Sequence, residues 1–301
     1  MKKIKIAIIG YGEVGKIFSK GLLDQSNVGQ ISSWDLKFID PILCKFELEH
    51  VKQAGVKAAL SMGEACAEAD LVISAVTASN TLSVAMEASA FLKPGSIFLD
   101  LNSASPGTKQ EAALVIEGQG SSYVEAGVMT SVPPYGIKVP MLLGGEKAQE
   151  LSEVLINWGM DAKAVSPKLG IASAIKMSRS IMIKGMESLV IEAYSTARFY
   201  GVEEYVLPTL VETFPQIDWT EQGAYFFSRV VQHGKRRSEE MREAARTVSE
   251  TGMPSLMASA IADKQAWVAG ISSQGVFKDL PKKAKWQDYA DALIAHIKRR
   301  G

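Results

Sequence analysis

The sequence predicts an α/β domain with a doubly wound, mainly parallel sheet, followed by an all-α domain. Up to about residue 165, short runs rich in β-branched residues alternate with helical segments, which is typical of βαβ units. After "VSPKLG" the strand signals almost vanish, and long segments rich in Ala, Met, Glu and Lys take over. We therefore expect two domains, residues 1–166 and 167–301.

The individual elements follow from hydrophobic periodicity and from turn residues. Strands are expected at residues 4–9, 31–35, 71–76, 96–101, 123–128, 141–143 and 162–165, with helices between most of the early ones. In the second domain, helices are expected at residues 169–200, 203–213, 219–251, 254–270 and 286–299. Helices between the strands would cover both faces of the sheet.

Length, composition and charge exclude several classes of protein. A chain of 301 residues is longer than one core usually serves, and 47% hydrophobic against 22% charged residues exclude a disordered chain. The 33 basic residues balance 33 acidic ones, so no overall field favours nucleic acid or an anionic membrane. No signal peptide or membrane span is predicted, and Cys44 and Cys66 lack a disulfide or metal spacing. These features favour a cytoplasmic location.

The most informative motif lies near the N-terminus. The segment "KIKIAIIGYGEVGKIFSKGL" carries Gly10, Gly12 and Gly15 in the G-x-G-x-x-G spacing, after a buried strand and before a helix. Gly10 permits the tight turn, Gly12 lets the backbone approach a pyrophosphate, and Gly15 lets the helix pack on the strand. The motif predicts a Rossmann-type dinucleotide site. The alternatives are a turn without a ligand and another adenosine-bearing ligand such as FAD.

The end of the second strand bears on the choice of cofactor. Asp35 lies 20 residues after Gly15, where a carboxylate accepts hydrogen bonds from a ribose 2′-hydroxyl and repels a 2′-phosphate. NAD is therefore preferred over NADP, although Lys37 lies close enough to weaken the preference. The residues expected to contact the cofactor are Gly10, Tyr11, Gly12, Glu13, Val14, Gly15, Asp35, Val76, Thr77 and Asn102.

Two further stretches release polar side chains where strands end. In "LKPGSIFLDLNSASPGT" a strand is followed by Asn102, Ser103 and Ser105, and in "YVEAGVMTSVPPYG" another runs into Thr130 and Ser131. Ligands of open α/β sheets bind outside the carboxyl ends of the strands. These side chains are therefore expected near the nicotinamide.

Four motifs in this order resemble the β-hydroxyacid dehydrogenase superfamily, which includes 3-hydroxyisobutyrate dehydrogenase and 6-phosphogluconate dehydrogenase. They are "GYGEVG", "DLNSASP", "EAGVMTS" and "GIASAIKMSRS", followed by a helical domain. The segment "HGKRRSEEMREAARTVSETGMP" and a later "AWVAG" look most like an uncharacterised bacterial subgroup labelled phosphogluconate-dehydrogenase-like. The resemblance implies a nicotinamide cofactor, a substrate that carries a carboxylate, and a homodimer formed through the helical domain.

The resemblance also implies roles for single residues. The catalytic lysine of the family falls on Lys176, and Ser103 fits the family's Ser/Thr near nicotinamide and substrate. Where the family has an asparagine four residues after the lysine, this sequence has Ser180, which loses the second donor of the amide. The family's Ser-Gly-Gly stretch, which receives the substrate carboxylate, corresponds to three substrate-binding candidates, Met129, Thr130 and Ser131.

One departure bears on decarboxylation. In 6-phosphogluconate dehydrogenase a glutamate seven residues after the lysine supplies a proton, and here that position is Ile183. Glu187 follows Lys176 by 11 residues, about 16 Å along a helix axis, so it cannot replace that glutamate. The sequence therefore argues against 6-phosphogluconate dehydrogenase itself.

Helical spacing predicts how the lysine is presented. Ser173, Lys176, Ser180 and Glu187 would form one polar stripe facing an interdomain cleft, with Lys184 at its edge. On the other side, Ile175, Met182, Met186 and Leu189 would pack. A free lysine has a pKa of about 10.4, so desolvation must lower it before the amine acts as a base. The alternative is that Lys176 reaches solvent or pairs with an acid.

A second basic cluster lies in "VVQHGKRRSEEMREAA". His233 and Lys235 are candidates for binding an anionic substrate, but such a helix is more often a solvated face with pairs such as Arg236 with Glu240. His50 and His296 have no companions that would complete a metal site, so none is predicted.

These observations predict an NAD(P)-dependent oxidoreductase that acts on the hydroxyl of a 3-hydroxy acid or sugar acid, with Lys176 as general acid and base and Ser180 and Ser103 beside it. Two alternatives stay open. One is an imine or ketone reductase of the same superfamily, and the other is a non-catalytic NAD-sensing protein.

Overall fold

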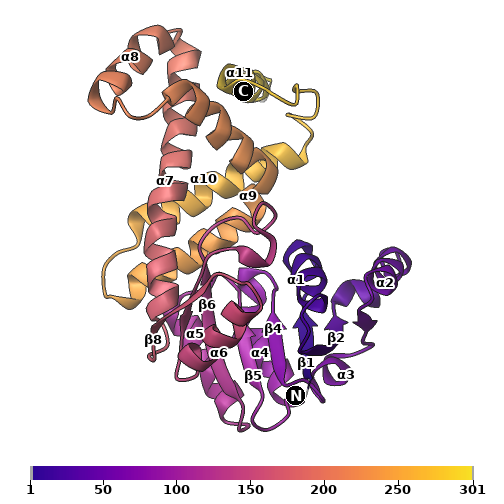
Figure 1. The fold of residues 1–301 in the computed structure, drawn as a ribbon. Coiled ribbons are helices and arrows are strands. Elements are labelled where there is room, and N and C mark those ends of the chain that lie inside the picture. Colours follow the sequence, from indigo (N-terminus) through magenta and orange to yellow (C-terminus); the bar gives the residue numbers. More distant parts are fainter. Residues whose placement is uncertain (1–2, 300–301) are drawn as a thin grey trace. The chain divides into compact units, whose positions relative to one another are not determined.

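The structure, a computed structural model, describes residues 3–299 of the chain (Figure 1). It divides into two compact units, Met1–Met177 and Ser178–Gly301, and the division falls inside the long helix α7 (Ile171–Tyr200). No helix within residues 3–299 combines the length and the apolar character that a membrane span requires.

The first unit is built on an eight-stranded sheet in the order β3-β2-β1-β4-β5-β6-β7-β8. The strands are β1 (Ile4–Ile9), β2 (Val28–Trp34), β3 (Lys57–Ala58), β4 (Leu71–Ser74), β5 (Ile97–Asp100), β6 (Ser122–Val128), β7 (Met141–Gly144) and β8 (Ala162–Ser166). Neighbouring strands are parallel except for the antiparallel pair of β6 and β7. The chain leaves β1 towards β2 on one side, and β4 lies on the other. This reversal of winding is where ligands of such sheets bind.

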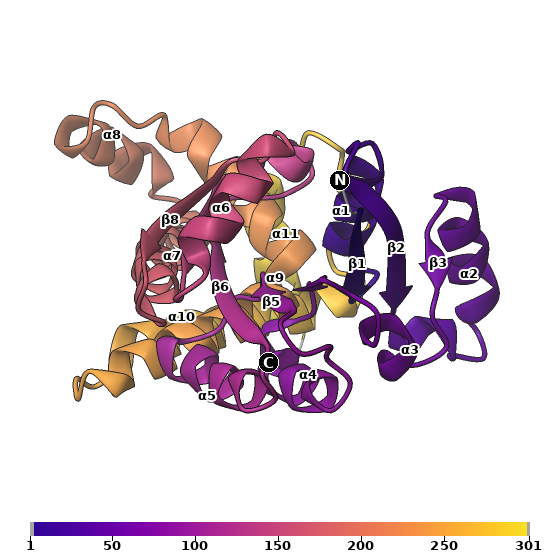
Figure 2. The same ribbon diagram turned by 60° about the horizontal axis from the view of Figure 1, so that its bottom comes forward.

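Helices cover both faces of this sheet. They are α1 (Glu13–Leu23), α2 (Cys44–Gln53), α3 (Met62–Cys66), α4 (Thr81–Ser89), α5 (Pro106–Glu117) and α6 (Ala148–Asn157), with 3₁₀ turns η1 (Leu36–Phe38), η2 (Ala78–Asn80) and η3 (Gly136–Lys138). In Figures 1 and 2, α4 and α5 lie on one face and α1 and α6 on the other. The central strands are therefore apolar on both sides, and Ala7, Ile8 and Val72 have no exposed surface.

The predicted fold class is confirmed, and each of the seven expected strands has a counterpart within a few residues. Strand β3 was not expected, because two residues are too short to show a period. The α/β alternation also gave no sign that β7 runs antiparallel to β6.

The second unit is helical, with the later part of α7 joined by α8 (Glu203–Thr213), α9 (Trp219–Glu250), α10 (Leu256–Ser273) and α11 (Trp286–Lys298). Aromatic residues dominate its core, where Tyr194 meets Trp286 and Phe227 stacks on Tyr289. Helix α9 begins at Asp218, whose carboxylate accepts the backbone N–H groups of the first turn.

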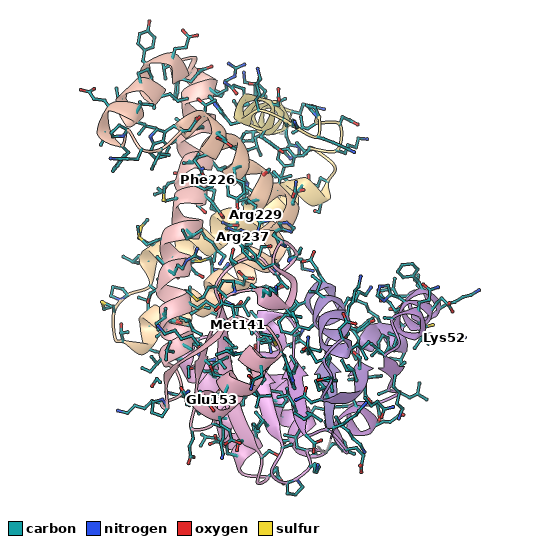
Figure 3. All side chains as sticks on the ribbon, viewed as in Figure 1. Lys52, Met141, Glu153, Phe226, Arg229 and Arg237 are labelled. Atoms are coloured by element: carbon teal, nitrogen blue, oxygen red, sulfur yellow. The ribbon has the colours of Figure 1, made fainter. Side chains whose placement is uncertain are left out.

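Polar side chains of α7 point into this helical unit, which corrects part of the predicted stripe. Lys184 is buried, and its Nζ lies 2.9 Å from Glu240 Oε2 on α9. Glu187 is 2% exposed and forms an ion pair with Arg237 of α9, a residue labelled in Figure 3. Burial leaves each charge dependent on its partner, so these residues hold α7 and α9 together.

The predicted packing side of α7 is confirmed only at Met186, which packs against the helical core, and is wrong at the other three positions for the same reason. Ile175, Met182 and Leu189 are 40%, 66% and 60% exposed. Because the paired charges occupy the inward side of the helix, the apolar side faces outward. The expected surface pair of α9 is present, with Arg236 Nη1 3.9 Å from Glu240 Oε1.

Helices α9 and α10 approach closely at Gly234, where an added Cβ would lie 2.9 Å from the backbone oxygen of Gln265. Alanine in place of a helical glycine normally stabilises by about 1 kcal/mol, but overpacking costs about 1–3 kcal/mol. We expect Gly234→Ala to lower the free energy of unfolding in urea. Gly270→Ala, in open space on α10, should raise it. Equal stabilisation by both variants would contradict the close approach.

Candidate active site

The sheet brings the predicted cofactor residues to one edge. Gly10 follows β1, Asp35 follows β2, Val76 follows β4, and Asn102 follows β5. Since these four strands are adjacent and parallel, their carboxyl ends share one edge of the sheet. Met129, Thr130 and Ser131 follow β6, the next strand along.

The glycine loop has the geometry that its spacing predicts. Gly10 has φ +94°, and a Cβ there would lie 2.5 Å from the backbone oxygen of Ala75. A Cβ on Gly15 would lie 2.0 Å from the backbone oxygen of Gly10, so only glycine lets α1 pack this closely on the turn. Gly12 is the N-cap of α1, and an added Cβ there would meet no atom within 4 Å.

This loop fits the pyrophosphate of a dinucleotide. No side chain caps the N-terminus of α1, although most helices need such a partner for their first N–H groups. The first turn, with exposed Glu13 and partly buried Val14, thus presents backbone donors to open space beside Gly12. A bound phosphate would satisfy those donors and the positive end of the helix dipole.

The carboxylate of Asp35 holds the glycine loop. Its Oδ2 accepts the backbone N–H of Tyr11 at 2.6 Å, and its Oδ1 accepts that of Lys37 at 2.9 Å. A carboxylate oxygen has two lone pairs, so each oxygen can still accept a ribose hydroxyl.

The side chain of Tyr11 lies under the loop in a cluster that the sequence analysis missed. Its hydroxyl lies 3.2 Å from His50 Nδ1, and its ring lies below the ammonium of Lys16. Lys16 Nζ is also 2.7 Å from Glu47 Oε2. Burial, and to a lesser extent the Glu47 charge, raise the pKa of Tyr11 to about 12. The phenol therefore stays neutral and ties the loop to α2.

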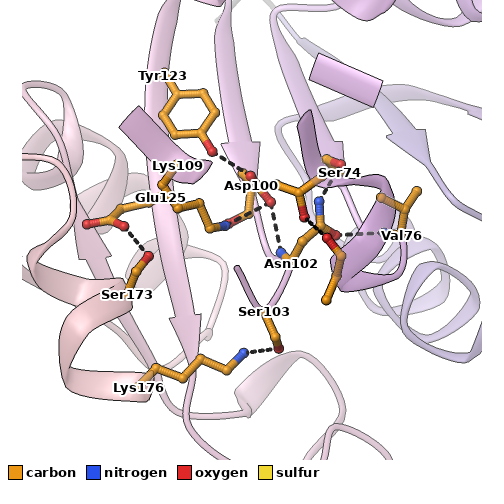
Figure 4. Close-up of polar contacts among 12 residues, drawn as sticks. Ser74, Val76, Asp100, Asn102, Ser103, Lys109, Tyr123, Glu125, Ser173 and Lys176 are labelled. Carbon is orange, nitrogen blue, oxygen red and sulfur yellow. Dashed lines mark hydrogen bonds and ion pairs between the residues drawn. The ribbon is translucent and has the colours of Figure 1, made fainter. Parts of the chain in front are cut away.

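Asn102 fixes the loops after β4 and β5 to each other. Its Oδ1 accepts the backbone N–H of Val76 at 2.7 Å, and its Nδ2 donates to Ser74 Oγ at 2.9 Å (Figure 4). Thr77 follows with an exposed side chain. Asn102 thus acts here through the backbone of the neighbouring loop.

Lys176 and Ser103 come together, although 73 residues separate them. Lys176 Nζ donates to Ser103 Oγ at 2.6 Å, and both side chains are partly exposed (Figure 4). The stem of Lys176 lies on Gly127 of β6, where an added Cβ would be 3.4 Å from Lys176 Cβ. An ammonium and a hydroxyl at the carboxyl end of β5 can bind an oxygen atom and exchange a proton with it.

Behind this pair lies a fully buried ion pair that the sequence analysis did not identify. Lys109 Nζ lies 2.9 Å from Asp100 Oδ1, and the two side chains are 1% and 0% exposed. Tyr123 donates to Asp100 Oδ2 at 2.5 Å, and the backbone N–H of Asn102 donates to Oδ1 at 2.8 Å. Burial, followed by the Asp100 charge, raises the pKa of Tyr123 well above its ordinary value, which keeps the phenol a donor.

A second buried carboxylate, Glu125, accepts hydrogen bonds from the start of α7. Its Oε1 accepts the backbone N–H groups of Gly170 and Ala172 at 2.7 and 3.1 Å, and its Oε2 accepts the hydroxyl of Ser173. Ser173 therefore faces the sheet and not the cleft that the polar stripe was expected to face. A single charged residue within the apolar runs "IFLD" and "YVEAGV" was the available sequence signal for Asp100 and Glu125.

The remaining candidates are less closely grouped. Thr130 is exposed, whereas Met129 and Ser131 are half-buried. In the helical unit, Ser180 is 6% exposed and accepts a hydrogen bond from Lys184 at 3.3 Å. Lys235 is exposed on α9, and His233 is partly exposed. Across the described residues, no group of three or more His, Cys, Asp or Glu is placed to hold a metal ion.

Comparison with known proteins finds a family match in each of the two parts of the chain. Residues 5–159 match the family described as the NAD binding domain of 6-phosphogluconate dehydrogenase. Residues 197–268 match a domain of unknown function that has been defined as a family of its own.

Solved structures with the same fold extend over nearly the whole chain. A conserved hypothetical protein from Sinorhizobium meliloti is 37% identical, with TM-score 0.76 over 97% of this chain and 96% of its own. A conserved protein of unknown function, described as similar to 3-hydroxyacid dehydrogenases, is 28% identical, with TM-score 0.68 over 90% of this chain and 99% of its own. The 3-hydroxyisobutyrate dehydrogenase of Mycobacterium tuberculosis shares the fold at 16% identity, with TM-score 0.64 over 97% and 99%. The chain therefore belongs to the β-hydroxyacid dehydrogenase superfamily and carries its NAD-binding domain at the N-terminus.

Proposed function

We propose that this protein is an NAD(P)-dependent oxidoreductase that acts on the hydroxyl of a 3-hydroxy acid or a sugar-acid-like carboxylate. The observation that carries the proposal is the hydrogen bond of 2.6 Å between Lys176 Nζ and Ser103 Oγ. This bond lies at the carboxyl end of β5, on the same edge of the sheet as the glycine loop. Such a pair can transfer a proton at a carbinol oxygen, and the family supplies the cofactor site.

In this proposal the nicotinamide, when bound, accepts the hydride from the carbinol carbon or returns it. The neutral amine of Lys176 takes the hydroxyl proton as the carbonyl forms, and the ammonium returns a proton in the reverse direction. Ser103 donates a hydrogen bond to the same substrate oxygen and orients it.

The substrate carboxylate is assigned to the segment after β6. Thr130 and Ser131 supply hydroxyl donors there, whereas Met129 supplies none. Ser180, His233 and Lys235 remain proposed substrate contacts. An exposed cation such as Lys235 suits a carboxylate more than an apolar group.

Replacement of the lysine tests the proposal. We expect Lys176→Met to reduce turnover at least about 100-fold, because general acid–base catalysis contributes about 10²–10⁴ in rate. NADH affinity, measured by fluorescence, should stay within about twofold. Lys168→Met, at an exposed lysine eight residues earlier, is the matched control and should keep full activity.

The assay is a screen of wild-type protein with NAD and NADP over 3-hydroxy acids and sugar acids, phosphorylated and not, with carbon dioxide measured. Turnover by Lys176→Met equal to that of the wild type would overturn the role of the lysine. Activity on imines or ketones without any hydroxy-acid turnover would select the reductase alternative, which Met129 and Ser180 favour by departing from the hydroxy-acid pattern. NADH binding with no turnover on any substrate would select a sensing protein.

The preferred cofactor is proposed to be NAD. Asp35 places a negative charge where a 2′-phosphate would lie, and Lys37 offsets it only in part. We expect Asp35→Asn to raise the affinity for NADPH relative to NADH by about tenfold, which corresponds to about 1.4 kcal/mol of relieved repulsion. Affinity for both should also fall, because Asp35 holds Tyr11.

Asp40→Asn is the matched control for this measurement. Asp40 also accepts backbone N–H groups, from Ile42 and Leu43, but it lies five residues further along and is not assigned to the ribose. An unchanged NADPH to NADH ratio in Asp35→Asn, measured by fluorescence titration, would contradict the proposed preference.

We also propose a homodimer formed through the helical unit. Met182 and Leu189 expose a large apolar side of α7, which a second copy of the chain would cover. In sedimentation velocity, the wild type should have twice the mass of one chain, and the double substitution Met182→Glu with Leu189→Glu should dissociate it. Leu114→Glu, at a leucine 75% exposed on α5, should leave the dimer intact. A wild-type monomer would contradict this proposal.

A further inference from the structure

Glu125 is a buried carboxylate that the proposed proton transfer does not use. It lies on β6 with no exposed surface, and Gly144 of the neighbouring strand leaves the space that its side chain fills. An added Cβ on Gly144 would lie 2.5 Å from Glu125 Oε1. Burying an ionised group is costly unless it is fully hydrogen-bonded, so its position is determined by its partners.

Those partners belong to the first turn of α7. The donors are the backbone N–H groups of Gly170 and Ala172 and the hydroxyl of Ser173. The N-terminus of a helix carries a partial positive charge, which compensates the carboxylate. Gly170 enters the turn with φ +95°, a conformation that favours glycine.

Glu125 and Gly127 place Lys176 jointly. They are alternate residues of β6 and so face the same side of the sheet. A Cβ on Gly127 would lie 3.0 Å from the backbone oxygen of Ala172 and 3.4 Å from Lys176 Cβ. Ala172 and Lys176 are one helical turn apart, so the clamp on Ala172 also sets the height of Lys176 above β6.

Ser103, the partner of Lys176, is held from the neighbouring strand β5. Asp100 of β5 lies in register with Glu125 and accepts the backbone N–H of Asn102, the residue before Ser103. Two buried carboxylates side by side therefore hold the two partners, one through the β5 loop and one through α7 (Figure 4).

We propose that Glu125 is the positioning residue of Lys176: it clamps the first turn of α7 so that the amine meets Ser103. The inference rests on the proposed function for its catalytic meaning. The placement itself is testable without a substrate.

The first test uses hydrogen exchange and competitive acetylation on the whole protein. In Glu125→Gln the amide oxygen still accepts from the backbone, so the exchange of the Gly170 and Ala172 amides should stay slow. In Glu125→Ala their exchange should accelerate at least about tenfold, since two buried donors lose their acceptor. Unchanged exchange in Glu125→Ala would overturn the clamp.

Acetylation by acetic anhydride, read by mass spectrometry, reports how freely each lysine amine reacts. In Glu125→Ala the amine of Lys176 should lose its hydrogen bond to Ser103 and label faster relative to exposed Lys163. Glu125→Gln, which keeps an acceptor for the Gly170 and Ala172 amides, should label as the wild type does. Glu153→Ala, at a glutamate that accepts a hydrogen bond from Gln149 on α6, is the matched control and should change neither lysine. Labelling of Lys176 in Glu125→Ala equal to that of the wild type would overturn the placement.

Turnover separates this inference from the proposed function. On a substrate that the wild type turns over, kcat should fall about 100-fold in Glu125→Ala, which loses the clamp, and stay near the wild-type value in Glu125→Gln, which keeps it, with KM and NADH affinity nearly kept in both. In a Lys176→Met background, Glu125→Ala should cause no further loss. A full additional loss there would overturn positioning through Lys176. If exchange and labelling respond as expected while no variant, including wild type, turns over any substrate, the placement holds and the enzymatic function fails.

Discussion

Two carboxylates lie side by side, in register, on the buried strands β5 and β6, and neither has any exposed surface. Asp100 and Glu125 could not both be ionised in an apolar interior without partners, because burial of an unpaired charge is prohibitive. The two carboxylates are compensated in different ways. Asp100 forms an ion pair with Lys109 and accepts a hydrogen bond from Tyr123, while Glu125 accepts hydrogen bonds from the N-terminus of α7. The position of the candidate active site depends on these two arrangements.

Three carboxylates of the sheet share one role, which is to accept backbone N–H groups of a neighbouring segment. Asp35 accepts backbone N–H groups of Tyr11 and Lys37, Asp100 that of Asn102, and Glu125 those of the first turn of α7. In each case an acidic side chain within a strand or directly after it holds the backbone of a loop or helix start. Loops that carry function need such support, because their own contacts are few. The cofactor edge and the Lys176–Ser103 pair are thereby fixed by side chains that need not touch a ligand.

Much of this was predictable from the sequence where the signal is local. The glycine spacing, the strand before it and Asp35 all lie within residues 4–35, so their order alone indicates the turn geometry that Gly10 and Gly15 show. Lys176 and Ser103 needed the superfamily resemblance as well, because nothing local links residues 73 positions apart.

The predictions from the sequence were incomplete or wrong where the partner of a charged side chain cannot be read from its neighbours in the chain. Glu125 and Lys184 are each a charge within an apolar stretch, whereas Lys109 is flanked by Thr108 and Gln110. Only the fold shows which opposite charge or helix end compensates each of them. Helical periodicity places Ser180, Lys184 and Glu187 on one side of α7 but cannot tell an inward polar side from an outward one. It therefore assigned Glu187 to a cleft and Leu189 to a core, whereas Glu187 pairs with Arg237 and Leu189 is exposed.

The most direct test of the account is a crystal structure of the protein with NADH bound. The account predicts the pyrophosphate over Gly12 at the start of α1, the ribose on Asp35, and nicotinamide C4 turned towards the Lys176–Ser103 pair. Between them there should be room for one carbinol carbon about 3–3.5 Å from C4. A nicotinamide that faces away from this pair, or a Lys176 that turns from Ser103 to solvent when the cofactor binds, would contradict it.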